Sequence, residues 1–189
     1  ADYVLITSTN TACSTDYRDF IGAHVESGAD ITMMYKTADA ENPYTNAIRS
    51  ENGKVTSVTE GVKAGDMEFI DCFIISRVLL IKIIEWFRAV DYLDIFDVLN
   101  DTFDKMDVRT YECRDYARSI MDVRSYFETT MQLLRPDVRD ELFGENRTVF
   151  TKIQDGVPTR YLADASVKNA LIPAGCTIAG TVTNSVLFS

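Results

Sequence analysis

Arg118 and Ser119 occupy the position in this sequence that is best suited to chemistry. They lie in residues 116–120, where side chains alternate as in a short strand, and Asp122 is placed to cap the helix that follows. The apolar residues of that helix fall on one face at helical spacing: Val123, Tyr126, Phe127, Met131 and Leu134. Because α/β proteins bind ligands where strands end and helices begin, we expect a substrate or metal group beside Arg118 and Ser119. The competing interpretation is plain scaffold, since a fold by itself implies no function.

The elements that must hold this strand end in place are short apolar runs. Residues 3–6, 31–35, 69–75 and 108–113 predict buried strands. Helical patterns separate them, the first capped by Thr15 and ended by Gly28, the second starting at Ser76 and the third covering 92–106. The run at 3–6 shows no polar alternation and therefore predicts a parallel strand buried on both faces. Strands that alternate with helices predict an α/β domain with a doubly wound, Rossmann-like sheet.

Turn residues and a short repeat organise the rest of the chain. Asn52-Gly53 predicts a hairpin between 47–50 and 54–58, the polar segment 37–45 predicts a loop, and Gly144 ends a short helix at 136–142. Further on, small or apolar residues recur every six positions, at Ala170, Cys176, Val182 and Phe188. Such a period is typical of a left-handed β-helix, and an irregular β-rich tail is the alternative. We therefore expect two domains, at 1–145 and 146–189.

Composition narrows the choice of partners. A formal net charge of −10 argues against nucleic acid or an anionic membrane, which need clustered Lys and Arg. The four cysteines form no CxxC pair, so we expect neither a zinc site nor a disulfide framework. His24 is the single histidine and has no second ligand at metal spacing, which predicts a structural role. No apolar run reaches membrane-spanning length and no signal peptide opens the chain, so we expect a cytoplasmic protein.

The stretch from Tyr116 to Asp122 resembles a motif of the sugar-nucleotide pyrophosphorylases, in particular the ADP-glucose pyrophosphorylase (glucose-1-phosphate adenylyltransferase) family. That motif reads Tyr-Trp-Arg-Asp-Val-Gly-Thr, so Arg118 is retained and the magnesium-binding aspartate is replaced by Ser119. A second family aspartate, in a Gly-Asp-His loop before a shared Asp-Tyr pair, falls on Asn10. Asn10 and Ser119 are thus degenerate metal positions, because magnesium prefers anionic oxygen ligands.

Other family motifs follow in the same order along nearly the whole chain. Glu60 matches the glutamate of a Glu-Lys-Pro motif whose lysine is missing here, so the resemblance implies that Glu60 and Arg118 are residual substrate-binding residues. The family's Ser-Met-Gly sugar motif falls on Phe69, Ile70 and Asp71, and a linker motif resembles 157–160. The glycine-rich nucleotide loop of the family is absent, which suggests a fragment of a longer protein. We expect no catalytic residue and no cofactor in this chain, where the family uses Mg²⁺.

The missing aspartates resemble the D-type subunit of Gram-positive bacteria. That resemblance implies a regulatory, non-catalytic subunit of glycogen biosynthesis, paired with a catalytic subunit in a hetero-oligomer and able to retain sugar nucleotide or glucose 1-phosphate as a ligand. Two alternatives stay open. One is an active enzyme with a shifted metal site, using Asp122 or Asp94. The other is a β-helix acyltransferase or an unrelated α/β binding module, since hexapeptide repeats occur in such proteins.

Overall fold

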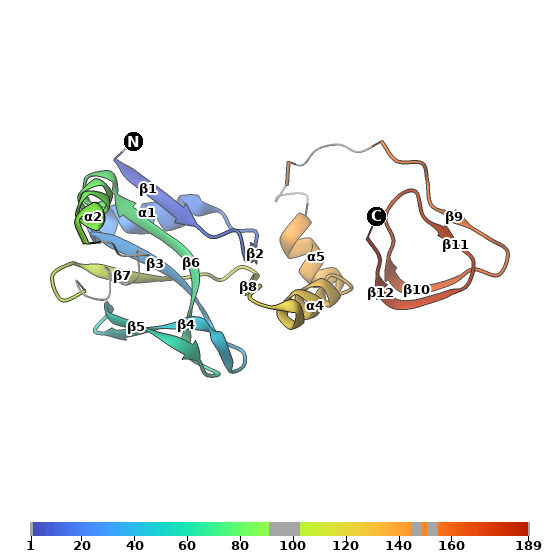
Figure 1. The fold of residues 1–189 in the computed structure, drawn as a ribbon, viewed down its shortest axis with the longest axis horizontal. Helices are drawn as coiled ribbons and strands as arrows, with labels where there is room; N and C mark the ends of the chain where they lie inside the picture. Colours follow the sequence, from blue (N-terminus) through green and yellow to red (C-terminus); the bar gives the residue numbers. More distant parts are fainter. Residues whose placement is uncertain (1, 91–102, 145–148, 151–154, 189) are drawn as a thin grey trace. The chain divides into compact units, whose positions relative to one another are not determined.

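The computed structural model describes residues 2–90, 103–144, 149–150 and 155–188, which form two compact units (Figure 1). Unit 1 is Ala1–Met121 and unit 2 is Asp122–Ser189. The expected domain division near residue 145 stays a prediction. None of the helices in the described ranges is long and apolar enough to span a membrane.

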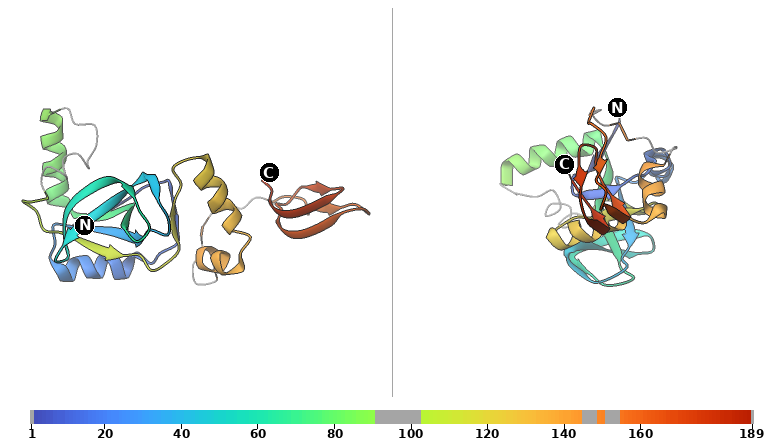
Figure 2. Two further views of the ribbon diagram at one scale, coloured as in Figure 1. Left: turned by 90° about the horizontal axis from the view of Figure 1, so that it is seen from below. Right: turned by 90° about the vertical axis from the view of Figure 1, so that its right-hand side faces the viewer.

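Unit 1 is built on one six-stranded sheet. Its strands are β1 (Tyr3–Thr7), β3 (Ile31–Thr37), β4 (Asn42–Glu51), β5 (Lys54–Val62), β6 (Met67–Ser76) and β7 (Val108–Glu112). Their order is β1-β6-β3-β7-β5-β4, and β4 also pairs with β6, so the strands from β6 to β4 curve back on themselves. Two helices cover the sheet, α1 (Tyr17–Ser27) and α2 (Arg77–Val90), and they lie on opposite sides of it in the left view of Figure 2.

Strand alternation gives the sheet two apolar faces. On β6, Phe73 and Ile75 face the larger core cluster, where Ile83 of α2 packs. Their neighbours Cys72 and Ile74 face the second cluster, where Phe20 of α1 packs. Each fully buried side chain of this kind stabilises the fold by about 1.5–3 kcal/mol. Each helix therefore packs its apolar face against one side of the sheet, and β6 contributes side chains to both of these contacts.

The ends of α1 are fixed by local hydrogen bonds. The predicted stop at Gly28 is confirmed, since this residue adopts the left-handed conformation with φ 64°. The predicted cap Thr15 is wrong. Asp16 caps the helix by accepting from the Arg18 N–H at 3.0 Å, and the Thr15 hydroxyl donates instead to Asp115 at 2.7 Å. A carboxylate one residue later competes for the same helix N–H groups, and the sequence pattern does not separate the two.

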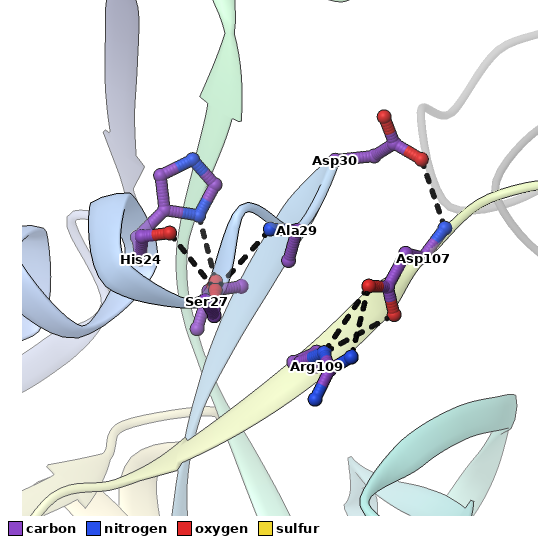
Figure 3. Close-up of polar contacts among 7 residues, drawn as sticks. His24, Ser27, Ala29, Asp30, Asp107 and Arg109 are labelled. Atoms are coloured by element: carbon purple, nitrogen blue, oxygen red, sulfur yellow. Dashed lines mark hydrogen bonds and ion pairs between the residues drawn. The ribbon is translucent and has the colours of Figure 1, made fainter.

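Side-chain contacts then tie the end of α1 to β3 and β7 (Figure 3). His24 is buried, with Nδ1 2.7 Å from the Thr32 hydroxyl, and the Ser27 hydroxyl donates to the His24 carbonyl at 2.8 Å. Asp30 accepts from the Asp107 N–H at 2.8 Å. The structural role expected for His24 fits this position, where it fills the space between the helix and the sheet.

The predicted α/β class is confirmed, and the expected direction of β1 is wrong. β1 pairs antiparallel with β6, Tyr3 lying opposite Ser76, and most of the strand is only partly buried. Within the described residues of this sheet, the parallel pair is β3 with β7. The apolar run at 3–6 has another cause, because Val4 and Ile6 pack on one core cluster and Leu5 on the other. An apolar run reports burial of both faces and says nothing about strand direction.

The Asn52-Gly53 hairpin is confirmed as the turn between β4 and β5. Both turn residues have positive φ, 53° and 78°, as a two-residue hairpin turn requires. The loop expected at 37–45 is shorter, because β4 already begins at Asn42. Ser76 accepts from the Leu79 N–H at 3.2 Å and thus caps α2 as expected. The helix predicted at 92–106 falls largely on 91–102, which lie outside the described residues, while Phe103 is buried in a turn.

The described residues of unit 2 form two helices and a short parallel coil. Its elements are α4 (Val123–Gln132), α5 (Pro136–Phe143), β9 (Arg160–Tyr161), β10 (Ser166–Leu171), β11 (Thr177–Ile178) and β12 (Thr181–Val186). The helix ends at Asp122 and Gly144 are as predicted. β10 pairs in parallel with β12, and β9 with β11. Ala170 and Phe188 both belong to the predicted six-residue repeat, and a strict repeat would bring them side by side in successive coils. In the structure Ala170 instead lies beside Ser185. A parallel coil is therefore present, and its description as a left-handed β-helix stays a prediction.

Candidate functional site

Two short strands bring the degenerate metal positions together. β2 (Thr11–Cys13) and β8 (Ala117–Ser119) pair antiparallel, with Thr11 opposite Ser119, and they lie side by side in Figure 1. The Ile120 N–H donates to the Asn10 carbonyl at 2.7 Å. Asn10 and Ser119 are thus neighbours in space although more than a hundred residues separate them in the sequence.

The Asn10 side chain is occupied by its own neighbours. Its Nδ2 lies 3.0 Å from the Met121 sulfur, and its Oδ1 accepts a hydrogen bond from the Ser8 hydroxyl. Ser8 in turn is fixed through its N–H, which donates to the Asp71 carbonyl at 2.9 Å. An amide held at both ends presents no charge to a ligand, and one of the two lone pairs of its oxygen is already engaged.

Ser119 lies in a half-buried polar patch with Thr45 and Glu68. The Ser119 and Thr45 side chains are 8% and 4% exposed, and neither hydroxyl makes a hydrogen bond of normal geometry within the described part of the chain. Both hydroxyls nevertheless lie near the carboxyl of Glu68 and lower its pKa. A buried polar atom without a good hydrogen bond costs free energy, so this patch is not optimised for stability alone.

Glu68 is the acidic residue at the centre of the patch. In the sheet it stands opposite Lys36 of β3 on one side and Ala47 of β4 on the other. Burial raises the pKa of the Glu68 carboxyl, and the Thr45 hydroxyl and the positive charges of Arg118 and Lys36 act in the opposite direction. Burial therefore favours the neutral form of the Glu68 carboxyl, whereas the two cations favour its charged form.

Lys36 and Arg118 are the cations of this patch, and each has a second contact. The Lys36 ammonium donates to the Ala117 carbonyl at 3.3 Å and lies 5.6 Å from the centre of the Tyr116 ring. The Arg118 guanidinium lies 3.9 Å from the carboxylate of Asp39, with its side chain 30% exposed. The predicted substrate residue Arg118 is thus beside Ser119 and Glu68.

Glu60, the other predicted substrate residue, is exposed on β5. It pairs with Asn46 of β4, so that β4 separates it from Glu68 on β6. Gly61, which follows it, has φ 78° and passes close to the backbone of Asn42 and Pro43. The structure therefore brings Asn10, Ser119 and Arg118 together and leaves Glu60 one strand away; its role stays a prediction.

Sequence reasoning missed three residues of this patch, Lys36, Thr45 and Glu68. The available signal was charge inside a strand, because Lys36 comes two positions after a run of four buried residues in β3, and six of the eight residues that follow Glu68 in β6 are buried. A charged residue within such a run needs a partner, and Lys36 and Glu68 stand opposite each other. Only the register of the sheet reveals this pairing.

The alternative metal ligands proposed from the sequence are differently placed. Asp122 is committed to capping α4, where its carboxylate accepts from the Ser125 N–H and hydroxyl, both at 2.6 Å. These Ser125 hydrogen bonds lower the pKa of Asp122. Asp94 lies outside the described residues. In the described ranges no three His, Cys, Asp or Glu side chains are grouped as they are around a metal ion.

The fold defines an α/β protein in which helices cover both faces of a mixed sheet, and a parallel coil follows in sequence. The polar patch around Glu68 lies at the β2–β8 strand pair. No family model matches the chain. It is similar to the glycogen biosynthesis protein GlgD of Bacillus subtilis (strain 168), at 24% identity over 98% of the chain and 46% of that protein. It is also similar to GlgD of Geobacillus stearothermophilus, at 30% identity with the same coverage, and to glucose-1-phosphate adenylyltransferase of Bacillus subtilis, at 26% identity over 99% of the chain and 51% of that protein.

These similarities confirm the predicted resemblance to the glucose-1-phosphate adenylyltransferase family and its GlgD proteins. The relatives share 186 to 197 aligned residues with the chain, so the likeness covers both units. The chain spans about half the length of the curated relatives it matches.

Proposed function

We propose that the whole protein is a regulatory subunit of the glucose-1-phosphate adenylyltransferase family in bacterial glycogen synthesis. The observation that carries this proposal is the β2–β8 strand pair, which brings Asn10 and Ser119 together in place of two carboxylates. The names of the relatives support the pathway, because GlgD is described as a glycogen biosynthesis protein. We propose the cytoplasm as its compartment.

The loss of catalysis follows from the chemistry of the ligands. Magnesium is held by hard, mostly anionic oxygens, and transfer of a phosphoryl group relies on the ion to neutralise charge on the reacting phosphates. The Asn10 carboxamide is already hydrogen bonded on both sides, and Ser119 offers a buried neutral hydroxyl. The nearby carboxyl of Glu68 faces two cations, whose charges oppose the entry of another cation. This residue set does not fit a magnesium site.

A chain that keeps the fold without the metal ligands can still act by binding. A subunit that prefers one conformation of a catalytic partner shifts that partner's equilibrium by the difference in affinity, typically about 1–3 kcal/mol. We propose a catalytic glucose-1-phosphate adenylyltransferase subunit as the partner and a hetero-oligomer as the assembly. Retained affinity for glucose 1-phosphate or a sugar nucleotide, through Arg118 and Glu60, belongs to the same proposal.

The test compares the full-length protein alone and together with a catalytic subunit from the same organism. Pyrophosphorolysis of ADP-glucose is measured with Mg²⁺ for each protein and for the co-expressed pair. We expect no turnover from this chain alone, co-purification with the catalytic subunit, and a changed substrate affinity or activator response in the pair. Turnover comparable with the catalytic subunit contradicts the loss of catalysis. Failure to co-purify, with unchanged kinetics, contradicts the regulatory role.

Two matched variants separate the chemistry from the assembly. Asn10→Asp and Ser119→Ala are each expected to leave the response of the pair unchanged, because neither residue holds a metal in this proposal. If Asn10→Asp alone creates magnesium-dependent turnover, the proposal has misjudged the remaining ligands. The open alternative of an enzyme with a shifted metal site gains no support from Asp122, which caps α4.

A further inference from the structure

The patch around Glu68 combines groups that usually surround a bound anion. Two cations, Lys36 and Arg118, approach it from β3 and β8, and the hydroxyls of Thr45 and Ser119 are buried beside it. Phosphate and sulfate groups are recognised in proteins by such a mixture of Lys or Arg charges and neutral hydrogen-bond donors. Here the anion at the centre is a side chain of the protein itself.

The cations are held in position by contacts other than Glu68. Lys36 is fixed by the Ala117 carbonyl at 3.3 Å and by the face of the Tyr116 ring, and Arg118 has Asp39 at 3.9 Å. Because β3, β6 and β8 are anchored by the two core clusters, the removal of the Glu68 charge leaves the positions of these groups determined by the fold. A preformed pair of cations facing two hydroxyls would then lack its anion.

We propose that Glu68 is an internal counter-ion in an anion-binding site formed by Lys36, Arg118, Thr45 and Ser119, and that it competes with small dianionic oxyanions such as phosphate groups for this site, so that the wild type binds them more weakly than a chain without the Glu68 charge. The charged groups that act on Glu68 in the described chain are Lys36 from β3 and Arg118 from β8, while β4 contributes the neutral Thr45. The site lies at the same strand end as the proposed function but does not require it, because anion binding is measured without any partner subunit.

Two unfavourable features of the patch support this assignment. The hydroxyls of Thr45 and Ser119 lack a well-formed hydrogen bond to any described group, so an oxyanion with more acceptor oxygens would satisfy them better than a single carboxylate does. Burial also raises the pKa of Glu68, so protonation of its carboxyl becomes easier as the pH falls and leaves the two cations without their counter-ion.

The test uses sulfate as the probe, because sulfate keeps both charges between pH 5 and 8. Its affinity for the whole chain is measured by calorimetry and by amide chemical shifts, for the wild type and for Glu68→Gln. The matched control is Glu51→Gln, which removes the same charge from an exposed position at the end of the β4–β5 hairpin. Glu68→Gln/Lys36→Met tests whether binding needs the cation, and Lys54→Met in the Glu68→Gln background controls for the lost charge.

We expect Glu68→Gln to bind sulfate at least about tenfold more tightly than the wild type at pH 7.5, with chemical-shift changes on β3, β6 and β8. Adding Lys36→Met should abolish the gain, whereas Lys54→Met should not. The affinity of the wild type for sulfate should rise as the pH is lowered from 7.5 to 5, whereas that of Glu68→Gln should not rise in the same way, and the wild-type arm needs no substitution. Equal affinities for Glu68→Gln and Glu51→Gln, or a gain that survives Lys36→Met, overturn the proposal.

A competition arm identifies the source of the phosphate group. Glucose 1-phosphate and AMP are titrated against sulfate bound to Glu68→Gln. Stronger competition by glucose 1-phosphate assigns the site to a sugar phosphate, and stronger competition by AMP assigns it to a nucleotide. If neither displaces sulfate, the site does not accept phosphate esters and the proposal fails for its ligand class.

Discussion

Replacing Phe20 with alanine should destabilise unit 1 more than most single substitutions in this chain. The Phe20 side chain is fully buried against Met34, Cys72 and Ala117 in the second core cluster, and its ring lies 5.1 Å from that of Tyr111. Loss of a buried phenylalanine costs about 3–5 kcal/mol, since both the transfer energy and the contacts around the new cavity are lost. The aromatic pair places Phe20→Ala at the middle of that range or above, about 4 kcal/mol.

The assay is urea unfolding followed by the fluorescence of Trp86. Trp86 is the single tryptophan in the sequence and lies on α2, so its signal reports unit 1. With an m-value of about 2 kcal/mol/M, a loss of about 4 kcal/mol lowers the midpoint by about 2 M urea. Ile21→Ala is the control, because Ile21 neighbours Phe20 on the same helix but is 40% exposed. Its cost should stay below about 1 kcal/mol.

The comparison of these two variants decides the result. Equal midpoints for Phe20→Ala and Ile21→Ala would show that α1 does not anchor this side of the sheet. A changed m-value without a changed midpoint would show that the substitution alters the compactness of the unfolded or the native state instead. In either case the assignment of Phe20 as the anchor beneath β2 and β8 would be wrong.

Four further outcomes follow from other positions. Burial lowers the pKa of His24, so the unfolded chain binds the proton more readily and the free energy of unfolding should fall as the pH drops below about 6.5; His24→Gln should flatten this part of the profile. Asp122→Ala should cost about 1 kcal/mol and increase hydrogen exchange in the first turn of α4, because the capping box is lost. Gly53→Ala should cost about 1–2 kcal/mol, since φ at this turn residue is 78°. Cys72 should resist alkylation by iodoacetamide at pH 8 in the folded chain, because it is 3% exposed and burial raises its pKa to about 12; mass spectrometry measures the modified fraction.

The Gly53→Ala outcome has a control within the chain. Gly22→Ala makes the same substitution as Gly53→Ala inside α1, where the added methyl group meets no neighbour, so it should stabilise by about 0.5–1 kcal/mol. Equal signs at the two glycines would contradict the turn argument. An unchanged pH profile in His24→Gln, unchanged exchange in Asp122→Ala, or rapid alkylation of Cys72 before unfolding would contradict the respective predictions.

Local chemistry made much of the fold predictable from the sequence. The Asn52-Gly53 turn, the Asp122 cap and the Gly28 stop all depend on interactions within a few residues, and all three are confirmed. The direction of β1 was not predictable, because an apolar run records burial on two faces and not the identity of the neighbouring strand. The cap of α1 was not predictable either, because the adjacent residues Thr15 and Asp16 both offer an oxygen to the first helix N–H groups.

The site was predictable only where a motif carried it. Asn10, Arg118 and Ser119 were found by resemblance, and the β2–β8 pairing places Asn10 and Ser119 together. Lys36 and Glu68 were missed because their pairing is a property of the sheet register, which bulges between Met34 and Tyr35. The irregularity leaves two extra residues on β6, Ile70 and Asp71, and shifts every later pair, so sequence spacing could not align these two charges.

The position of β6 has a consequence for the order in which unit 1 folds. β6 pairs with β1, β3 and β4, and its contacts with β1 join residues as distant as Tyr3 and Ser76. The β4–β5 hairpin closes through Glu51 and Lys54 and can form within about 1–10 μs. Its edge is then available for β6, whereas β1 and β7 must each close a long loop before they gain any contact. We therefore expect slow, non-local docking of β1 and β7 to limit the folding rate, and a kinetic intermediate to contain β4, β5 and β6.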